Sequence, residues 1–358
     1  MRGPDPETAP VNPIEKVVRT VDHAQQHQPV LGFLFGVNKK YGDDRAGQLA
    51  ALLTYYGFLT VFPLLLLFVT IIGIVAGSDP HLAHRIEHSV FSEFPVIGSG
   101  SGKNSLANNI HALHRNSVIG LVIGILGLVW GSQGASETGQ FAMAQVWNIP
   151  GVHRPNYWTR LARASLFMVV LGLFAIVSFG LSGIAGWGDH SIGIRIGGIV
   201  GSLVVNGLSY LIGFRVLTPK QIGTRQLVPG AMVGAVFWTV LQNVGTELVE
   251  HQLRGSSQVY GSFALVLGLI AWMYLTLNLT MYAAEANVVL ARRLWPRSMM
   301  QPPLTRADEE VLSAIAKQEE RRPEQTVHVA FDRAEPAPSD PVPEEASSDP
   351  ASDEAPIA

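Results

Sequence analysis

Charged side chains stand at the ends of long apolar stretches in this 358-residue sequence. Glu285 follows an uncharged run over 255–284, Glu137 closes a second apolar run and Arg215 closes a third. Ionisable groups at such positions are costly to bury in lipid, so they are paired, wetted or functional. We expect Glu285 to pair with Arg215, either as a site for a lipid headgroup or a proton, or as a structural ion pair at a helix end.

Polar residues inside the apolar runs add to this chemistry. The four that we single out are Tyr55, Tyr56, Asn206 and Asn278. Together with the three charged residues, we predict that they line a substrate pathway. Pro63 lies in the middle of the first run, and proline removes one backbone hydrogen bond, so we expect a kink that serves either as a hinge or simply as shape.

Three histidines, His81, His84 and His88, have the spacing of one helical face. Neutral imidazoles so placed could bind Zn²⁺, but no second-shell partner is evident, and a solvated polar face explains them better. The chain has no cysteine, which rules out thiol catalysis and Cys-ligated metals. It also lacks a G-x-S-x-G elbow, a Walker loop, an H-E-x-x-H pair and a dinucleotide fingerprint. We therefore predict no enzyme, no cofactor and no metal.

Six uncharged apolar runs must position these residues. They cover 49–76, 117–136, 164–187, 196–214, 228–246 and 259–284. About 20 apolar residues span a bilayer as a helix, and only a helix satisfies its own backbone hydrogen bonds in lipid. The sequence predicts an all-α, polytopic membrane bundle with six transmembrane helices. Glycine pairs at i, i+4, such as Gly230 with Gly234, should face into the bundle or toward a second copy.

The distribution of Lys and Arg predicts the orientation. Near the ends of the runs, twelve of them lie before the first run, between the second and third, between the fourth and fifth, and after the sixth, against five in the other connections. Because Lys and Arg resist translocation, both termini should be cytoplasmic and 77–116 should be an extracytoplasmic loop.

Three regions follow from this pattern. Residues 1–45 form a cytoplasmic segment in which 14–34 has the pattern of an amphipathic helix, interrupted at Gln28-Pro29 and placed either on the membrane surface or against the protein's own loops. Residues 46–300 form the transmembrane domain. Residues 301–358 are acidic and Pro-rich, with 14 Asp and Glu against 5 Lys and Arg from 304 onward, and should be disordered apart from a helix within 306–320.

The order of several short motifs resembles the YihY/BrkB family of six-span bacterial inner-membrane proteins. These motifs are Tyr55-Tyr56, Phe62-Pro63-Leu64-Leu65-Leu66, Trp130 with Ser132, Trp147-Asn148, Val228-Pro229-Gly230-Ala231, Val259-Tyr260-Gly261, Trp272 and Ala284-Glu285. Members usually have Gly-Ala-Glu where this chain has Ala283-Ala284-Glu285, which keeps the carboxylate. The resemblance implies a multi-pass protein of the bacterial inner membrane. Family members have been labelled ribonucleases or serum-resistance virulence factors and suspected of moving or organising lipids.

Three functions compete on these observations. We favour transport or organisation of a lipid or other amphiphile in the bacterial envelope, with membrane lipids as partners. The alternative is a non-transporting scaffold that recruits a cytoplasmic protein through its acidic tail. A membrane-associated ribonuclease ranks last, because the body ahead of the tail is too weakly basic to predict nucleic-acid binding. The glycine faces leave a homo-oligomer open.

Overall fold

The computed structural model describes residues 13–78, 117–154, 156–167, 192–299 and 304–331, and these residues form helices and no strand. Three of the helices contain a segment long and apolar enough to cross a membrane: 46–64, 200–217 and 266–292. The prediction of an all-helical membrane protein is confirmed to that extent, while six spans and cytoplasmic termini stay predictions. The predicted loop 77–116 and most of the predicted span 164–187 lie outside the described residues.

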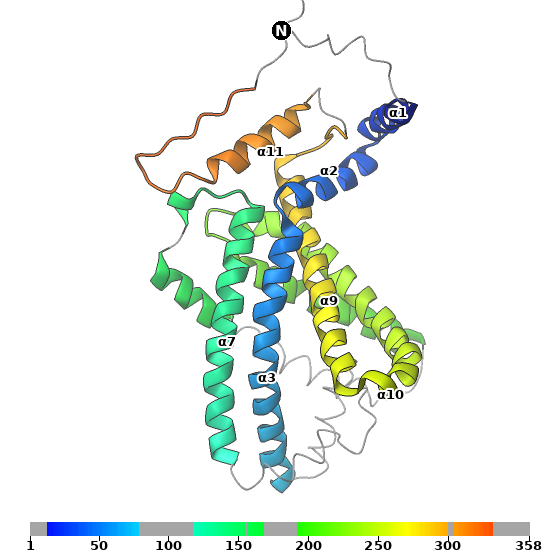
Figure 1. The fold of residues 1–358 in the computed structure, drawn as a ribbon, viewed down its shortest axis with the longest axis vertical. Coiled ribbons are helices and arrows are strands. Elements are labelled where there is room, and N and C mark those ends of the chain that lie inside the picture. The colour runs from blue at the N-terminus through cyan, green and yellow to red at the C-terminus, as the bar shows by residue number, and fades with distance from the viewer. Residues whose placement is uncertain (1–12, 79–116, 155, 168–191, 300–303, 332–358) are drawn as a thin grey trace, which may run out of the picture. The chain divides into compact units, whose positions relative to one another are not determined.

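Two long helices form an antiparallel pair. They are α3 (Ala46–Ser78) and α7 (Ser117–Val146), which lie side by side in Figure 1. Glycines of α7 face α3 at successive turns. A Cβ added at each of them would contact a residue of α3: Gly124 faces Leu67, Gly127 faces Pro63, Gly131 faces Thr60 and Gly134 faces Tyr56. These glycines let the two backbones approach closely. The contact agrees with the expectation that glycine pairs at i, i+4, here Gly127 with Gly131, face into the bundle.

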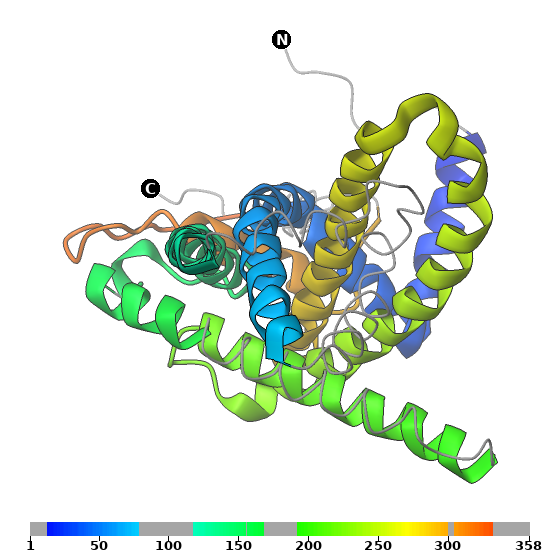
Figure 2. The same ribbon diagram turned by 90° about the horizontal axis from the view of Figure 1, so that it is seen from below.

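The fifth and sixth predicted runs fall within one continuous helix, α10 (Thr224–Arg292), which follows α9 (Ile192–Leu217). The backbone N–H of Gly230 donates to Oδ1 of Asn287 at 2.6 Å. These residues are 57 positions apart, and at about 1.5 Å per residue a straight helix would separate them by more than 80 Å. The helix therefore bends back on itself, as Figure 2 shows, and its two halves pack as a hairpin.

The N-terminal segment forms two helices, α1 (Pro13–His27) and α2 (Pro29–Asp43), divided at the predicted Gln28-Pro29 interruption. On α1 the apolar side chains of Val17 and Val21 are exposed, whereas the polar Asp22 and Gln25 are buried. Asp22 Oδ1 accepts from the N–H of Met299 at 3.0 Å. The polar side of α1 thus packs on the protein and leaves apolar side chains outward, an arrangement suited to a membrane surface.

The buried core gathers at one end of the long helices, where α2, the last turns of α7 and α10, and α11 (Arg306–Lys317) meet. Trp147, Val288, Leu294 and Val311 are nearly inaccessible there. We call this end the core end. The tail was predicted to be disordered except for a helix, and the structure has that helix packed against the core. In the segment after it, the carbonyl of Glu320 accepts a hydrogen bond from the N–H of Val152 at 2.8 Å. Residues 332–358 lie outside the described part of the chain.

Candidate functional site

A buried lysine is the centre of one polar network at the core end. Lys40, on the last turn of α2, is fully buried, and its ammonium donates to Glu285 Oε2 at 3.0 Å and to the carbonyl of Val146 at 2.7 Å. It also pairs with Asp44, one turn further along, and Asp44 Oδ1 accepts from Asn148 Nδ2 at 3.0 Å. The network joins α2, α7 and α10 through one cation and two carboxylates.

The predicted pair of Glu285 with Arg215 is wrong. Glu285 pairs with Lys40, and Arg215 instead donates to the carbonyl of Ile222 at 2.7 Å, within the turn between α9 and α10. Lys40 reaches Glu285 because the chain turns at Asp44 and Arg45, where Arg45 has a left-handed φ of 53°. The side chains are enclosed and Lys40 pairs with both carboxylates, although Glu285 Oε1 has no partner among the described residues. The contacts are those of a structural ion pair rather than an open site.

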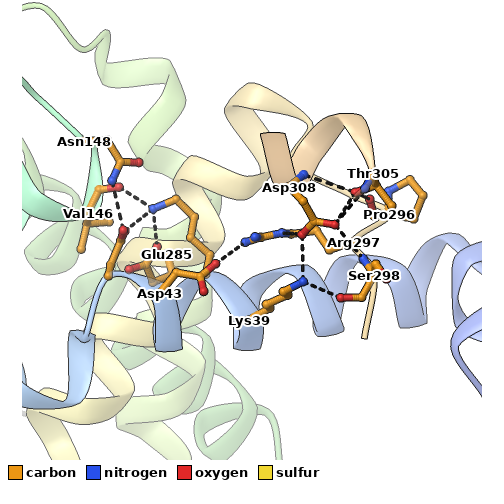
Figure 3. A network of polar contacts seen from close by, with 12 residues as sticks. Lys39, Asp43, Val146, Asn148, Glu285, Pro296, Arg297, Ser298, Thr305 and Asp308 are labelled. Atoms are coloured by element: carbon orange, nitrogen blue, oxygen red, sulfur yellow. Dashed lines mark hydrogen bonds and ion pairs between the residues drawn. The ribbon is translucent and has the colours of Figure 1, made fainter. Parts of the chain in front are cut away.

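A second network fixes α11 to the core end (Figure 3). Asp308 Oδ1 accepts from Lys39 Nζ at 2.9 Å and from Arg297 Nε at 2.8 Å, and its Oδ2 accepts from the N–H of Ser298 at 3.1 Å. Arg297 is fully buried and also pairs with Asp43 at 2.8 Å. Although burial raises the pKa of Asp308, the hydrogen bonds from Lys39, Ser298 and other donors outweigh it and hold the pKa at about 2.

Replacing Asp308 with asparagine should release α11, because Lys39 and Arg297 then lose their shared counter-charge. The wild-type pKa lies below the ordinary 3.8, so the carboxylate contributes its full stability above about pH 4 and loses it as pH falls toward 2. A shift of this size corresponds to about 2 kcal/mol, or roughly a thirtyfold change in the opening equilibrium. Hydrogen exchange of the α11 amides at neutral pH, compared between wild type and Asp308→Asn, measures this change in the opening equilibrium.

The matched control is Arg306→Gln, at an exposed position of the same helix, which should leave exchange unchanged. Equal amide protection in wild type and Asp308→Asn would show that the ionic contacts do not hold α11.

A second polar site at the core end is a pocket, unlike the enclosed Lys40 network. It is a small pocket lined by Glu137, Gln140, Phe141, Ala144, Arg154, Arg160, Arg163, Leu217 and Pro219. We call it the arginine pocket. Its walls come from the last turns of α7, the chain after the 3-10 turn Gly151–His153, the helix over 157–167 and the end of α9. Three guanidinium groups and one carboxylate share it with apolar side chains.

The cations of the pocket are incompletely paired. Arg160 Nη2 lies 4.0 Å from Glu137 Oε1, the limit of an ion pair, and both side chains are partly exposed. Arg154 Nη2 donates to Gln145 Oε1 at 2.8 Å, and its guanidinium lies over the Phe141 ring at 5.2 Å from the centroid. The buried Nε atoms of Arg154 and Arg160 have no hydrogen-bond partner within the part of the chain that the structure describes.

The predicted pathway residues do not converge. Glu137 alone lines the arginine pocket, while Arg215 is close enough to Arg163 to lower the pKa of its guanidinium, after the larger effect of burial. The other predicted residues lie apart from the pocket. Asn206 donates to Thr239 Oγ1 at 3.3 Å, and Asn278 accepts from the Tyr41 hydroxyl. On α3, Tyr56 packs on Gly134 and Pro63 packs on Gly127, while Tyr55 is 58% exposed. His81, His84 and His88 lie outside the described residues.

Sequence reasoning missed the arginines as site residues. It used Arg154, Arg160 and Arg163 only as topology markers, although Arg160 and Arg163 have the i, i+3 spacing of one helix face. Three arginines within ten positions were the signal available. Lys40 was overlooked in the same way, as one of the basic residues that precede the first run.

The all-helical fold with span-length apolar helices defines an integral membrane protein. A family model described as Virulence factor BrkB matches residues 37–307, about three quarters of the sequence, and the chain belongs to this family. It is similar to the inner membrane protein YhjD of Escherichia coli, at 24% identity over 76% of this chain and 84% of the relative. A UPF0761 membrane protein of Acinetobacter baylyi is 22% identical over 72% of this chain and 62% of its own length.

No solved structure matches the chain. The family and these relatives place the protein in the bacterial inner membrane. The resemblance inferred from the residues is confirmed.

Proposed function

We propose that the protein transports or organises a lipid or other amphiphile in the bacterial inner membrane and is not an enzyme. One observation carries the proposal: the arginine pocket combines guanidinium groups with an apolar wall from Phe141, Ala144 and Leu217. Such a mixed lining suits a molecule with a charged head and an apolar body. The Lys40 network, in contrast, is closed and serves to hold the helices in place.

We further propose six spans with both termini in the cytoplasm, which puts the arginine pocket at the inner leaflet. The excess of Lys and Arg in the segments on the side of the termini supports this orientation. Two exposed aromatic side chains, Tyr157 and Trp158, lie on the helix that carries Arg160 and Arg163 and also suit this orientation. Amphipathic aromatic rings concentrate at the membrane–water boundary, where headgroups lie.

Movement of a fluorescent anionic lipid between leaflets of liposomes that contain the purified protein tests this function. We expect protein-dependent movement that falls at least tenfold in the Arg160→Gln/Arg163→Gln variant, because the pocket then loses two cations. Arg225→Gln, an exposed arginine at the start of α10, is the matched control and should retain the activity. Well-folded protein with no movement of any of several headgroups would rule out transport.

The scaffold remains the second candidate, because the acidic tail continues beyond the docked α11. Deleting 332–358 separates the two functions. A transporter should keep its activity in liposomes, whereas a scaffold should lose the recruitment of its cytoplasmic partner.

A further inference from the structure

We propose that the arginine pocket binds the phosphate group of an anionic lipid headgroup, with Arg154 and Arg160 as the donors and Glu137 as an internal competitor. The inference deepens the proposed function, on which it depends for a lipid rather than a soluble ion as the source of the phosphate.

The charge balance of the pocket favours an anion. Arg154, Arg160 and Arg163 bring three positive charges, and Glu137 is the single carboxylate in the lining. Burial lowers the pKa of the Arg154 guanidinium more than the nearby Glu319 raises it, and burial together with Arg215 lowers the pKa of Arg163. Arginine nevertheless keeps its proton in proteins, so the cost of crowding these cations is relieved when an anion binds between them.

Unsatisfied hydrogen-bonding atoms in the lining suit a phosphate headgroup. The Nε atoms of Arg154 and Arg160 are buried donors without a partner among the described residues, so a rotation of each guanidinium toward the pocket would let them bind phosphate oxygens in the planar geometry of this group. Gln140 is 5% exposed, and its Nε2 donates to the carbonyl of Arg160 at 3.1 Å. Its Oε1 is a buried acceptor without a partner among the described residues, which a hydroxyl of the headgroup would satisfy.

Glu137 is suited to compete with the incoming phosphate. Its carboxylate faces Arg160 at 4.0 Å, too long for a direct hydrogen bond, and about a third of the side chain is exposed. A partly exposed ion pair of this kind contributes little, so a phosphate with better geometry can displace it. The carboxylate also reduces the affinity of the pocket for any anion through like-charge repulsion, which keeps binding reversible.

The surroundings of the pocket indicate a lipid. Trp158 is 73% exposed, Tyr157 is 53% exposed and Phe141 is 42% exposed. Tyr157 and Trp158 lie on the helix over 157–167, which also carries Arg160 and Arg163. A soluble phosphate ion would make no use of the exposed Phe141 ring in the lining, whereas the chains of a lipid held at the pocket would lie against it. The exposed rings of Tyr157 and Trp158 suit a helix at the membrane–water boundary.

Binding to the purified full-length protein in a neutral detergent tests the inference separately from transport. The probes are dihexanoyl phosphatidylglycerol, dihexanoyl phosphatidylcholine and inorganic phosphate, each titrated at low salt. We expect phosphatidylglycerol to bind best, with Arg160→Gln and Arg154→Gln each weakening it about tenfold or more. Glu137→Gln should strengthen it severalfold, a gain that loss of folding cannot produce. Arg225→Gln should bind as wild type.

The outcomes separate the two proposals. Equal binding of both lipids would overturn the preference for an anionic headgroup. Binding unchanged in Arg154→Gln and Arg160→Gln would overturn the phosphate site. Inorganic phosphate that binds as tightly as phosphatidylglycerol, and is weakened by the same variants, would overturn the lipid source and remove the support for lipid transport. Phosphatidylglycerol binding with the expected variant pattern, but without movement in liposomes, would support the site and contradict transport alone.

Discussion

Replacing Lys40 with methionine is expected to lower the free energy of unfolding by about 3–5 kcal/mol, the largest effect of any substitution at the core end. Lys40 is the single cation of a buried set that holds Asp44 and Glu285, and all three side chains are almost completely inaccessible. Removing one partner of a buried ion pair leaves the other charge uncompensated, which costs far more than the pair itself contributes.

An unfolding titration of the purified protein with sodium dodecyl sulfate in mixed micelles measures this effect. Lys220→Met, at an exposed lysine after α9, is the matched control and should change stability by less than about 0.5 kcal/mol. The triple variant Lys40→Met/Asp44→Asn/Glu285→Gln should recover much of the loss, because neutral groups of similar shape replace the whole charged set. An unfolding midpoint of Lys40→Met equal to that of wild type would contradict the role of the network.

Replacing Gly230 with alanine should be nearly as damaging. A Cβ at this position would collide with the carbonyl oxygen of Ala283 and with the Asn287 amide. The atoms on the far side are backbone and a buried side chain, so they cannot swing away, and the two halves of α10 must separate. The hydrogen bond from the Gly230 N–H to Asn287 would break as they do. We expect a loss of about 3 kcal/mol, at the upper end of overpacking effects.

Gly201 offers a matched control within another helix. A Cβ added there meets no atom of the described residues within 4 Å, so Gly201→Ala should be neutral or should stabilise the helix by up to about 1 kcal/mol. The same unfolding titration compares the two variants. If Gly230→Ala and Gly201→Ala unfold alike, the close approach of the α10 halves is not what holds them together.

The sequence by itself determined that the chain is an all-helical membrane protein. Membrane insertion depends on the summed transfer free energy of about 20 consecutive residues, which is a local property that can be read directly from the apolar runs. The i, i+4 glycine spacing in 120–131 likewise predicted a close helix contact, because residues four apart lie on one helix face. The break at Gln28-Pro29 divides α1 from α2 in the same local way.

Only the tertiary structure decided which charges meet. Lys40 and Glu285 are 245 positions apart, and Lys39 and Asp308 are 269 apart, so no local pattern relates them. Their pairing depends on the turn after α2 and on the bend that folds α10 into a hairpin. These two features bring the ends of α2, α10 and α11 to the same level of the bundle. The arginine pocket has the same origin, because α7, the helix over 157–167 and the end of α9 each supply part of its wall. A local sum fixes where a helix forms, whereas the partner of a charge is fixed by packing between distant segments.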